Sequence, residues 1–482
     1  MQITVIQRVL GLLLILFSLT MLPPTVVSLI YQDGALEAFL NAMALIVVLG
    51  FVIWWPVRNV RRDLRLRDGF VVVVMFWVAL GLSGAVPLLL SERPHISVTD
   101  AIFESMSGLT TTGATVIEGL DSLPPSILFY RQQLQWLGGM GIVVLAVAIL
   151  PFLGVGGMQL YRAEMPGPMK ETKLTPRITD AAKALWLIYL GLTVACGLAY
   201  WAAGMGPFDA VTHSFSTVAI GGFSTHDASF GYFDNPLVES VAIVFMLLAG
   251  VNFALHFAAL RSASLRPYAG DAEFRAYVLI LSLLAVVSVA FLYFSGHAEL
   301  SSAIRDGLFQ AVSIGTTTGF TTADFALWPG FLPVLLLFGS FIGASAASTG
   351  GGMKVIRFLL LFKQGMRELN RLVHPSAELA VKIGRKALPD HVVHAVWGFF
   401  AAYVALFVLM LLMLMATGVD QVTAFSAVAA CMNNLGPGLG EVAANYARLN
   451  EFSKWVLAFA MLLGRLEIFT LLVLFTPAFW RK

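Results

Sequence analysis

The stretch DAIFESMSGLTTTG, from Asp100 to Gly113, has the pattern of a short amphiphilic helix followed by a turn rich in threonine and glycine. The pattern occurs three more times: DAVTHSFSTVAIGG at 209–222, DGLFQAVSIGTTTG at 306–319 and a degenerate TAFSAVAACMNNLG at 423–436. In every copy the first residue and the last glycine are 13 positions apart, and long apolar segments lie on both sides. Such a layout is typical of the pore loops of ion-selective membrane proteins. Four copies predict one polypeptide that surrounds one pore.

The composition indicates a protein that crosses the membrane several times. Of the 482 residues, 58% are hydrophobic and 12% are charged, whereas soluble domains carry about 25% charged residues. The mean hydropathy is +0.83, and the net charge of +2 is too small to indicate a nucleic-acid partner. The two cysteines, Cys196 and Cys431, provide neither a disulfide framework nor a metal-binding spacing.

Ten apolar segments are long enough to cross a bilayer, which takes roughly 20 residues of helix. These segments are residues 8–30, 36–55, 69–91, 128–153, 183–205, 236–260, 275–296, 330–358, 391–417 and 452–478. Four shorter and more polar segments, at 98–111, 207–220, 301–317 and 420–434, contain the repeated pattern. We expect these to be re-entrant, because irregular backbone at membrane depth must face protein or water.

The predicted fold is an all-α membrane protein with ten transmembrane helices, in which four tandem helix–pore-loop–helix repeats follow two extra helices. The extra helices occupy residues 1–68, and the repeats occupy 69–160, 161–265, 266–385 and 386–482. Of the 30 Lys and Arg residues, 24 lie on one side of the predicted spans, which the positive-inside rule makes cytoplasmic. Both chain ends then lie in the cytoplasm, and all four short segments enter from outside.

The turns that end the short segments contain the candidate ligands for a cation. Stretched, glycine-containing turns expose backbone carbonyls that can replace the water around a monovalent cation. Since no acidic side chain stands in these turns, carbonyl lining favours a potassium-type site, and K⁺ is the only bound species expected. The predicted filter residues are Thr111, Thr112, Gly113, Ile220, Gly221, Gly222, Thr317, Thr318, Gly319, Asn434, Leu435 and Gly436. We expect the residues that open the four copies, Asp100, Asp209, Asp306 and Thr423, to cap the half-helices.

A glycine-rich run, GSFIGASAASTGGG at 339–352, interrupts the eighth predicted span. Small residues at helical spacing allow close helix packing, whereas three consecutive glycines break a helix and leave a loop. The residues alone leave packing and gating open. The position below the third filter puts such a loop in the conduction path. The predicted gate residues are Gly343, Ala344, Ser345, Ser348, Thr349, Gly350, Gly351, Gly352, Lys354 and Arg465.

Arg465 and Glu467 are charged residues inside the last predicted span. A charge at mid-helix costs on the order of 2.5–3.5 kcal/mol, so each must face protein or water. Because residues two positions apart point to different faces of a helix, we expect no salt bridge between them. Arg465 is then either an electrostatic barrier to cations or a pin between helix ends, and the residues alone leave both open.

Several strings resemble one family over essentially the whole chain. They are LTTTGAT at 109–115, QWLGGMGI at 135–142, AEMPGP at 163–168, AIGGFST at 219–225, GVNFALHF at 250–257, TTTGFTT at 316–322, STGGGMK at 348–354, NNLGPGLG at 433–440 and GRLE at 464–467. The resemblance is to the superfamily of TrkH, KtrB and plant HKT potassium transporters, and TrkH-type bacterial subunits, with their two extra helices, fit best. All four filter glycines are present, as in potassium-selective members; some plant members have serine at the first position and prefer sodium.

The resemblance implies K⁺ uptake through a gated, carbonyl-lined filter rather than an enzyme reaction. It further implies that the run at 339–352 is an intramembrane gating loop with Arg465 near the pore. The implied assembly is a homodimer in the bacterial inner membrane, regulated by a cytosolic TrkA-type subunit that binds NAD(H), ATP or ADP.

Other classes of membrane protein fit the sequence less well. An H⁺- or Na⁺-coupled potassium symporter with alternating access usually has inverted repeats and ionisable residues at the midplane, whereas these repeats are parallel and their spans carry few charges. The sequence does not decide against a less selective K⁺/Na⁺ transporter, which stays an alternative prediction. A membrane enzyme would need clustered His, Asp or Glu at one face, and the sequence contains no such cluster and no GxxxxGK[ST] motif.

Overall fold

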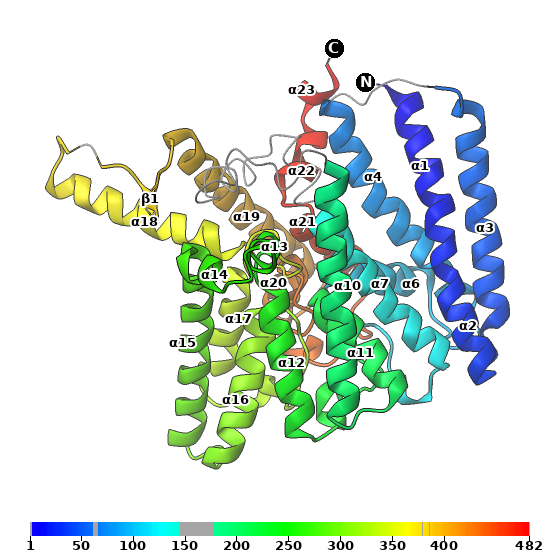
Figure 1. Cartoon of the computed structure of the whole chain (residues 1–482), viewed down its shortest axis with the longest axis horizontal. Helices are drawn as coiled ribbons and strands as arrows, with labels where there is room; N and C mark the ends of the chain where they lie inside the picture. The colour runs from blue at the N-terminus through cyan, green and yellow to red at the C-terminus, as the bar shows by residue number, and fades with distance from the viewer. Residues whose placement is uncertain (1, 61–65, 145–177, 378, 385, 482) are drawn as a thin grey trace.

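The protein is a bundle of helices built around four half-length helices whose residues are mostly buried (Figure 1). The structure, a computed structural model, describes residues 2–60, 66–144, 178–377, 379–384 and 386–481. Among them, the only strands are β1 (Lys382–Ile383) and β2 (Lys386–Ala387), which form an antiparallel hairpin. The predicted all-α fold class is confirmed.

Each half-length helix is flanked in chain order by other helices of its own predicted repeat. The leading helices are α1 (Ile3–Ser18), α2 (Leu22–Tyr31) and α3 (Leu36–Trp54). Around the first half-helix, α6 (Val98–Leu109), lie α4 (Leu66–Gly84), α5 (Val86–Leu90) and α7 (Pro125–Val144). Around the second, α11 (Pro207–Ala219), lie α10 (Ile178–Ala202), α12 (Pro236–Ala249) and α13 (Phe253–Ser262).

The second half of the chain follows the same order. Around the third half-helix, α16 (Leu300–Gly315), lie α14 (Arg266–Gly270), α15 (Ala272–Phe294), α17 (Leu332–Ile342) and α18 (Val355–Val373). Around the fourth, α20 (Gln421–Met432), lie α19 (Asp390–Ala416), α21 (Glu451–Arg465), α22 (Phe469–Leu472) and α23 (Pro477–Trp480). In the part of the chain that the structure describes, the 3-10 turns are η1 (Leu19–Met21), η2 (Trp55–Val57), η3 (Leu120–Ser122), η6 (Ser229–Tyr232), η7 (Phe325–Leu327), η8 (Gly440–Val442) and η9 (Val473–Phe475).

The predicted count of ten transmembrane helices is not confirmed. The described residues contain six helices that are long and apolar enough to cross a membrane, or eight if two bent pairs each count as one span. The span predicted at 236–260 bends by 93° between α12 and α13, and the one at 452–478 bends by 108° between α21 and α22. The span predicted at 330–358 ends as a helix at Ile342 and resumes only at Val355. The end of the span predicted at 128–153 lies outside the described residues.

The repeat boundaries stay predictions. The boundary between the first two repeats, at 160, lies outside the described residues, as does the string at 163–168. Residue 385, where the third repeat is predicted to end, also lies outside the described residues. Both ends of the described chain lie at the same end of the bundle (Figure 1), where Arg67 Nη1 donates a hydrogen bond of 2.9 Å to the carbonyl oxygen of Arg481.

The predicted capping residues are wrong, because the half-helices start earlier than the repeated pattern. Ser97 caps α6, with its Oγ accepting from the Asp100 backbone N–H at 3.1 Å, and Asp420 caps α20 in place of Thr423. Asp209 and Asp306 hold the chain beyond the turn instead. Each accepts from a threonine hydroxyl 16 residues later, Thr225 at 2.7 Å and Thr322 at 3.1 Å. These carboxylates therefore attach the segment that follows the turn, here called the return strand, to the half-helix.

Candidate functional site

The four turns predicted as filter strands have one backbone geometry. In each turn the filter glycine and the residue two positions before it have positive φ angles: Thr111 and Gly113, Ile220 and Gly222, Thr317 and Gly319, Asn434 and Gly436. The residue between them closes the half-helix by donating its N–H five residues back, at 2.8, 2.8, 2.7 and 2.8 Å in the four repeats. This is the Schellman closure of a helix end. The degenerate fourth copy therefore folds like the other three.

Three of these left-handed positions are occupied by β-branched residues. Thr111, Ile220 and Thr317 have φ angles of 53°, 54° and 69°, a conformation that is a genuine outlier for such side chains. Only Asn434 is a residue type that tolerates it well. Backbone strain of this kind costs of order 1–3 kcal/mol per residue and concentrates at functional sites. The turns are therefore held in place by the surrounding structure and not by local preference.

The four turns meet in a closed ring. A Cβ on Gly113 would overlap the carbonyl oxygen of Gly221, one on Gly222 that of Thr318, and one on Gly319 that of Leu435. The ring closes at Gly436, where a Cβ would lie 2.7 Å from the carbonyl oxygen of Thr112. Each filter glycine thus abuts the carbonyl just before the filter glycine of the next repeat. The predicted filter residues are brought together from all four repeats in chain order.

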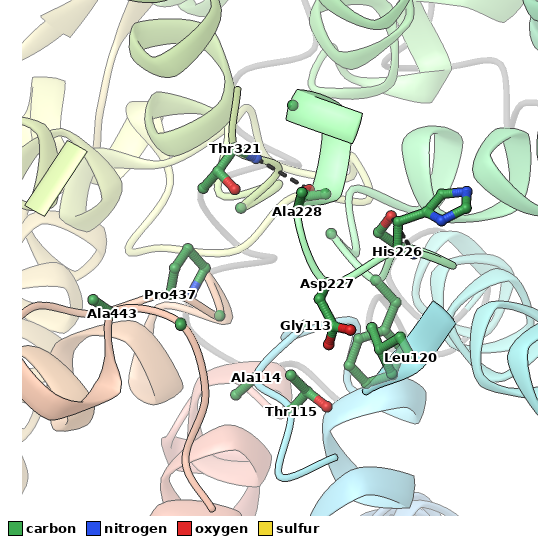
Figure 2. A pocket seen from close by; sticks show the side chains of 18 of the residues that line it. Gly113, Ala114, Thr115, Leu120, His226, Asp227, Ala228, Thr321, Pro437 and Ala443 are labelled. Carbon is green, nitrogen blue, oxygen red and sulfur yellow. Dashed lines mark hydrogen bonds between the residues drawn. The ribbon is translucent and has the colours of Figure 1, made fainter. Parts of the chain in front are cut away.

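A cavity of about 450 Å³ opens directly above this ring. All four filter glycines line it, together with residues that follow each turn, such as Thr115, Asp227, Thr321 and Pro437 (Figure 2). Two carboxylates, Asp227 and Asp324, and the imidazole of His226 belong to its wall. The cavity joins the ring to the side of the molecule that the charge distribution assigns to the outside.

His226 connects the walls of the first two repeats. Its Nδ1 lies 2.5 Å from Asp121 Oδ1 in the first repeat, and its Nε2 lies 3.6 Å from Asp209 Oδ1 on α11. Its ring stacks on Tyr232, with centroids 3.4 Å apart. Burial alone would lower the pKa of His226, but the hydrogen bonds and charges of Asp209 and Asp121 raise it above 6.5. The pKa of Asp121 is lowered, because its hydrogen bond with His226 outweighs partial burial.

The opposite side of the ring is covered by residues 343–354, the loop between α17 and α18. The loop contains all predicted gate residues except Arg465. The Gly351 N–H donates to Thr317 Oγ1 at 2.7 Å, and the Gly352 N–H donates to the Asn433 carbonyl at 3.0 Å. Thr349 Oγ1 donates to the Val218 carbonyl at 2.9 Å. The loop therefore contacts the second, third and fourth repeats where their half-helices end, on the face of the ring opposite the cavity.

Arg465 and Lys354 both hold this loop. Arg465 Nη2 donates to the Thr349 carbonyl at 3.1 Å, and Lys354 Nζ donates to the Gly350 carbonyl. Glu467 makes its ion pair with Arg357 of α18, at 2.6 Å. Arg465 and Glu467 thus have different partners, as expected. Glu467 itself lies in the break between α21 and α22, where it has a φ of 55°.

Sequence reasoning missed the side chains that support the ring from behind. Glu104 and Arg131 form an ion pair of 2.7 Å in which both side chains are 1% exposed, and Gln135 reaches the second turn. Arg131 stands within the predicted apolar span 128–153, and an ionisable residue at membrane depth is a signal of function. Within the described residues no group of three or more His, Cys, Asp or Glu side chains is placed to hold a metal ion.

Comparison with known proteins identifies the family. The TrkH family, described as cation transport proteins, matches residues 35–482. The chain belongs to the TrkH family. It is 60% identical to the Trk system potassium uptake protein TrkH of Vibrio parahaemolyticus over 100% of both chains, and 57% identical to the TrkH protein of Escherichia coli K12, again over 100% of both. The Trk system potassium uptake protein TrkG of the same E. coli strain is 43% identical over 100% of this chain and 99% of its own length.

The fold of a solved TrkH structure matches as well. The crystal structure of the potassium transporter TrkH from Vibrio parahaemolyticus superposes with a TM-score of 0.93, at 57% identity and with 100% of both chains covered. The predicted resemblance is confirmed, and this TrkH-family chain is a multi-pass membrane protein. Its relatives are named as transporters and not as enzymes, in agreement with the sequence-based prediction.

If the ring conducts cations, replacing Gly222 by alanine should abolish the flux, because a Cβ at φ +81° would overlap the Thr318 carbonyl oxygen. Gly296→Ala is the matched control, since Gly296 has φ +70° but no atom within 4 Å. Both variants carry left-handed strain of about 1–2 kcal/mol, and only the first disturbs the ring. Uptake into proteoliposomes, normalised to monodisperse protein, distinguishes them; equal uptake by the two variants contradicts the ring as the conduction site.

The link between His226 and Asp121 makes stability depend on pH. Because the pKa of His226 is raised, its contribution is complete below 6.5 and is lost as the pH rises through the raised value. The thermal unfolding midpoint of the wild type should therefore fall between about pH 6.5 and 9 by more than that of His226→Gln, a difference equivalent to roughly 0.2–1 kcal/mol for a partly exposed pair. Parallel pH profiles for the two proteins would show that the link contributes nothing.

Proposed function

We propose that this chain takes up potassium by passing K⁺ through the ring formed by its four filter turns. The relatives at 57–60% identity are named potassium uptake proteins. The chemistry of the ring supports the same ion, because the turns offer backbone carbonyls and hydroxyls and no carboxylate. Carbonyl lining of this kind replaces the hydration shell of K⁺.

The closed succession of glycine-to-carbonyl contacts is the observation on which this proposal rests. Four strands that touch in the order of the repeats, with strained turns and a cavity above them, form the arrangement that a carbonyl-lined filter requires. In the proposed pathway K⁺ enters the outer cavity, loses water at the ring and leaves toward the cytoplasm. No chemical step and no further cofactor is needed.

In this proposal residues 343–354 are the gate. The loop lies against the inner ends of three turns through Thr349, Gly351 and Gly352. Movement of the loop away from the ring would open the path. Arg465, which holds the Thr349 carbonyl at 3.1 Å, adds a positive charge at the same level, and a fixed charge of this sign repels a passing cation.

The proposal includes a location and partners. We place the chain in the bacterial inner membrane with both ends in the cytoplasm, which agrees with the position of both ends on one side of the bundle (Figure 1). The relatives' names refer to a Trk system, and the resemblance to TrkH implies a homodimer regulated by a cytosolic TrkA-type subunit that binds NAD(H), ATP or ADP.

A flux assay in proteoliposomes with K⁺, Rb⁺, Na⁺ and Li⁺ tests the proposed function. We expect K⁺ and Rb⁺ to pass much faster than Na⁺ and Li⁺, in the absence of any imposed proton or sodium gradient. Equal fluxes of K⁺ and Na⁺ contradict a selective filter. Flux that occurs only with an imposed H⁺ or Na⁺ gradient contradicts the channel mechanism and supports coupled symport.

Arg465→Ala should increase K⁺ flux, because it removes both the charge and the hydrogen bond that holds Thr349. A loss of about 1.4 kcal/mol from the barrier raises the rate about tenfold. Arg371→Ala is the control, since Arg371 lies on α18, is 44% exposed and pairs only weakly with Glu368 at 3.4 Å. A folded Arg465→Ala protein with unchanged or lower flux argues that Arg465 is a structural pin.

A further inference from the structure

The second filter turn has no side chain at the position just before the filter glycine, where each of the other three turns has one. The residue before the filter glycine is Thr112 in the first repeat, Thr318 in the third and Leu435 in the fourth, and all three are fully buried. Thr112 and Thr318 also form hydrogen bonds of 2.8 Å with the threonine two positions before them. The second repeat has Gly221 at this position. Two consecutive glycines, 221 and 222, have more conformational freedom than any other dipeptide, so this turn needs support from elsewhere.

Gln135 occupies the space that a side chain at position 221 would fill. A Cβ built on Gly221 would overlap the carboxamide of Gln135, whose side chain is completely buried. The Gln135 Nε2 donates to the Gly221 carbonyl at 2.6 Å, and its Oε1 accepts from the Phe223 N–H at 3.1 Å. One carboxamide therefore bridges the backbone on both sides of Gly222.

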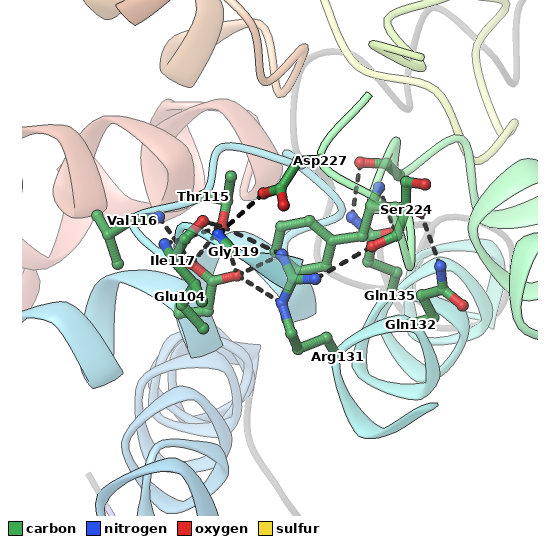
Figure 3. A network of polar contacts seen from close by, with 12 residues as sticks. Glu104, Thr115, Val116, Ile117, Gly119, Arg131, Gln132, Gln135, Ser224 and Asp227 are labelled. Atoms are coloured by element: carbon green, nitrogen blue, oxygen red, sulfur yellow. Dashed lines mark hydrogen bonds and ion pairs between the residues drawn. The ribbon is translucent and has the colours of Figure 1, made fainter. Parts of the chain in front are cut away.

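Two neighbours of Gln135 extend this support along the same strand. Gln132 Nε2 donates to the Phe223 carbonyl at 3.1 Å, and Arg131 Nη1 donates to the Ser224 carbonyl at 3.2 Å (Figure 3). All three side chains come from α7, which belongs to the first repeat. The helix of one repeat thus holds the filter strand of the next from residue 221 to residue 224.

The same network also holds the first repeat's own strand. Arg131 is fixed by Glu104 of α6, at 2.7 Å with both side chains 1% exposed. Glu104 accepts from the Val116 N–H at 2.9 Å, three residues beyond Gly113 (Figure 3). A buried pair that is satisfied on all sides is rigid and costly to break. The Glu104–Arg131 pair therefore holds the first and the second filter strands in place together.

We propose that Gln135 is a selectivity-determining positioning residue, which replaces the missing side chain of position 221 and fixes the Gly221 carbonyl in the ring. The proposal rests on the proposed function, because it concerns the same filter. The Gly221 carbonyl is the ring member that abuts Gly113, and a carbonyl has two lone pairs, so one can accept from Gln135 while the other faces an ion. Without Gln135, the Gly221-Gly222 segment is free to collapse around a smaller cation.

Gln135→Leu tests this role, because leucine keeps much of the volume and removes both hydrogen bonds. The measured quantity is the ratio of K⁺ to Na⁺ uptake into proteoliposomes, for protein that is monodisperse. We expect the ratio to fall about tenfold, since a lost hydrogen bond changes relative ion affinity by up to about 1.4 kcal/mol. Total K⁺ uptake should change less than the ratio does.

Gln133→Leu is the matched control. Gln133 lies two positions away on α7, is 5% exposed and makes one hydrogen bond of 2.8 Å to the Thr20 carbonyl, away from the ring. Its substitution should leave the uptake ratio unchanged. A Gln135→Leu protein with the wild-type ratio overturns the proposal, and so does one that only lowers the yield and total uptake in proportion.

A second pair of variants serves if Gln135→Leu does not fold. Gln135→Ala empties the space beside Gly221, and adding Gly221→Thr supplies the side chain that the first and third turns have. We expect the double variant to be more selective than Gln135→Ala alone, whereas Gly221→Thr alone collides with Gln135. Equal ratios for the double variant and Gln135→Ala overturn the proposal. If the wild type itself does not prefer K⁺, the proposed function fails, and that result is obtained before any variant is made.

Discussion

The contact between each filter glycine and the carbonyl oxygen of the next repeat constrains the rest of the structure. It leaves no room for a Cβ, and the glycine φ angles of 81° to 96° exclude other residues on conformational grounds as well. Four separate turns must therefore reach one axis with little tolerance. Buried side chains hold the turns in position through hydrogen bonds to their backbone. The Tyr446 hydroxyl donates to the Gly436 carbonyl at 2.6 Å, and Ser313 Oγ donates to the Phe320 carbonyl at 2.7 Å.

Breaks in the longer helices are the second consequence of this arrangement. A broken helix at membrane depth frees backbone groups that must find partners within the protein. The break after α12 and the loop 343–354 satisfy each other: the Ser345 N–H donates to the Gly250 carbonyl at 3.0 Å, and the Phe253 N–H donates to the Ala347 carbonyl at 3.1 Å. Glu273 accepts from the Ala346 N–H at 2.6 Å. The bend in the second repeat therefore supports the loop of the third.

The sequence predicted the parts of this structure that depend on local pattern. The 13-residue spacing located four half-helices and the glycines that meet in the ring, including those of the degenerate fourth copy, and the three glycines at 350–352 predicted the interruption after Ile342. The expectations that failed depend on contacts that the repeated pattern and the hydropathy do not contain. Asp209 and Asp306 bind threonines of the return strand instead of capping, and the 93° and 108° bends follow from packing that hydropathy does not contain. The hydrogen bond between Gln135 and Gly221 joins residues 86 positions apart, so no local sequence pattern predicts it.

Crystallographic location of Rb⁺, a heavier substitute for K⁺, tests the central claim most directly. Crystals grown or soaked in Rb⁺ should show anomalous density on the axis of the ring, between the carbonyls of Thr112, Gly221, Thr318 and Leu435, and the density should disappear when Na⁺ replaces Rb⁺. Rb⁺ density confined to other parts of the protein, with none at the ring, would contradict the account.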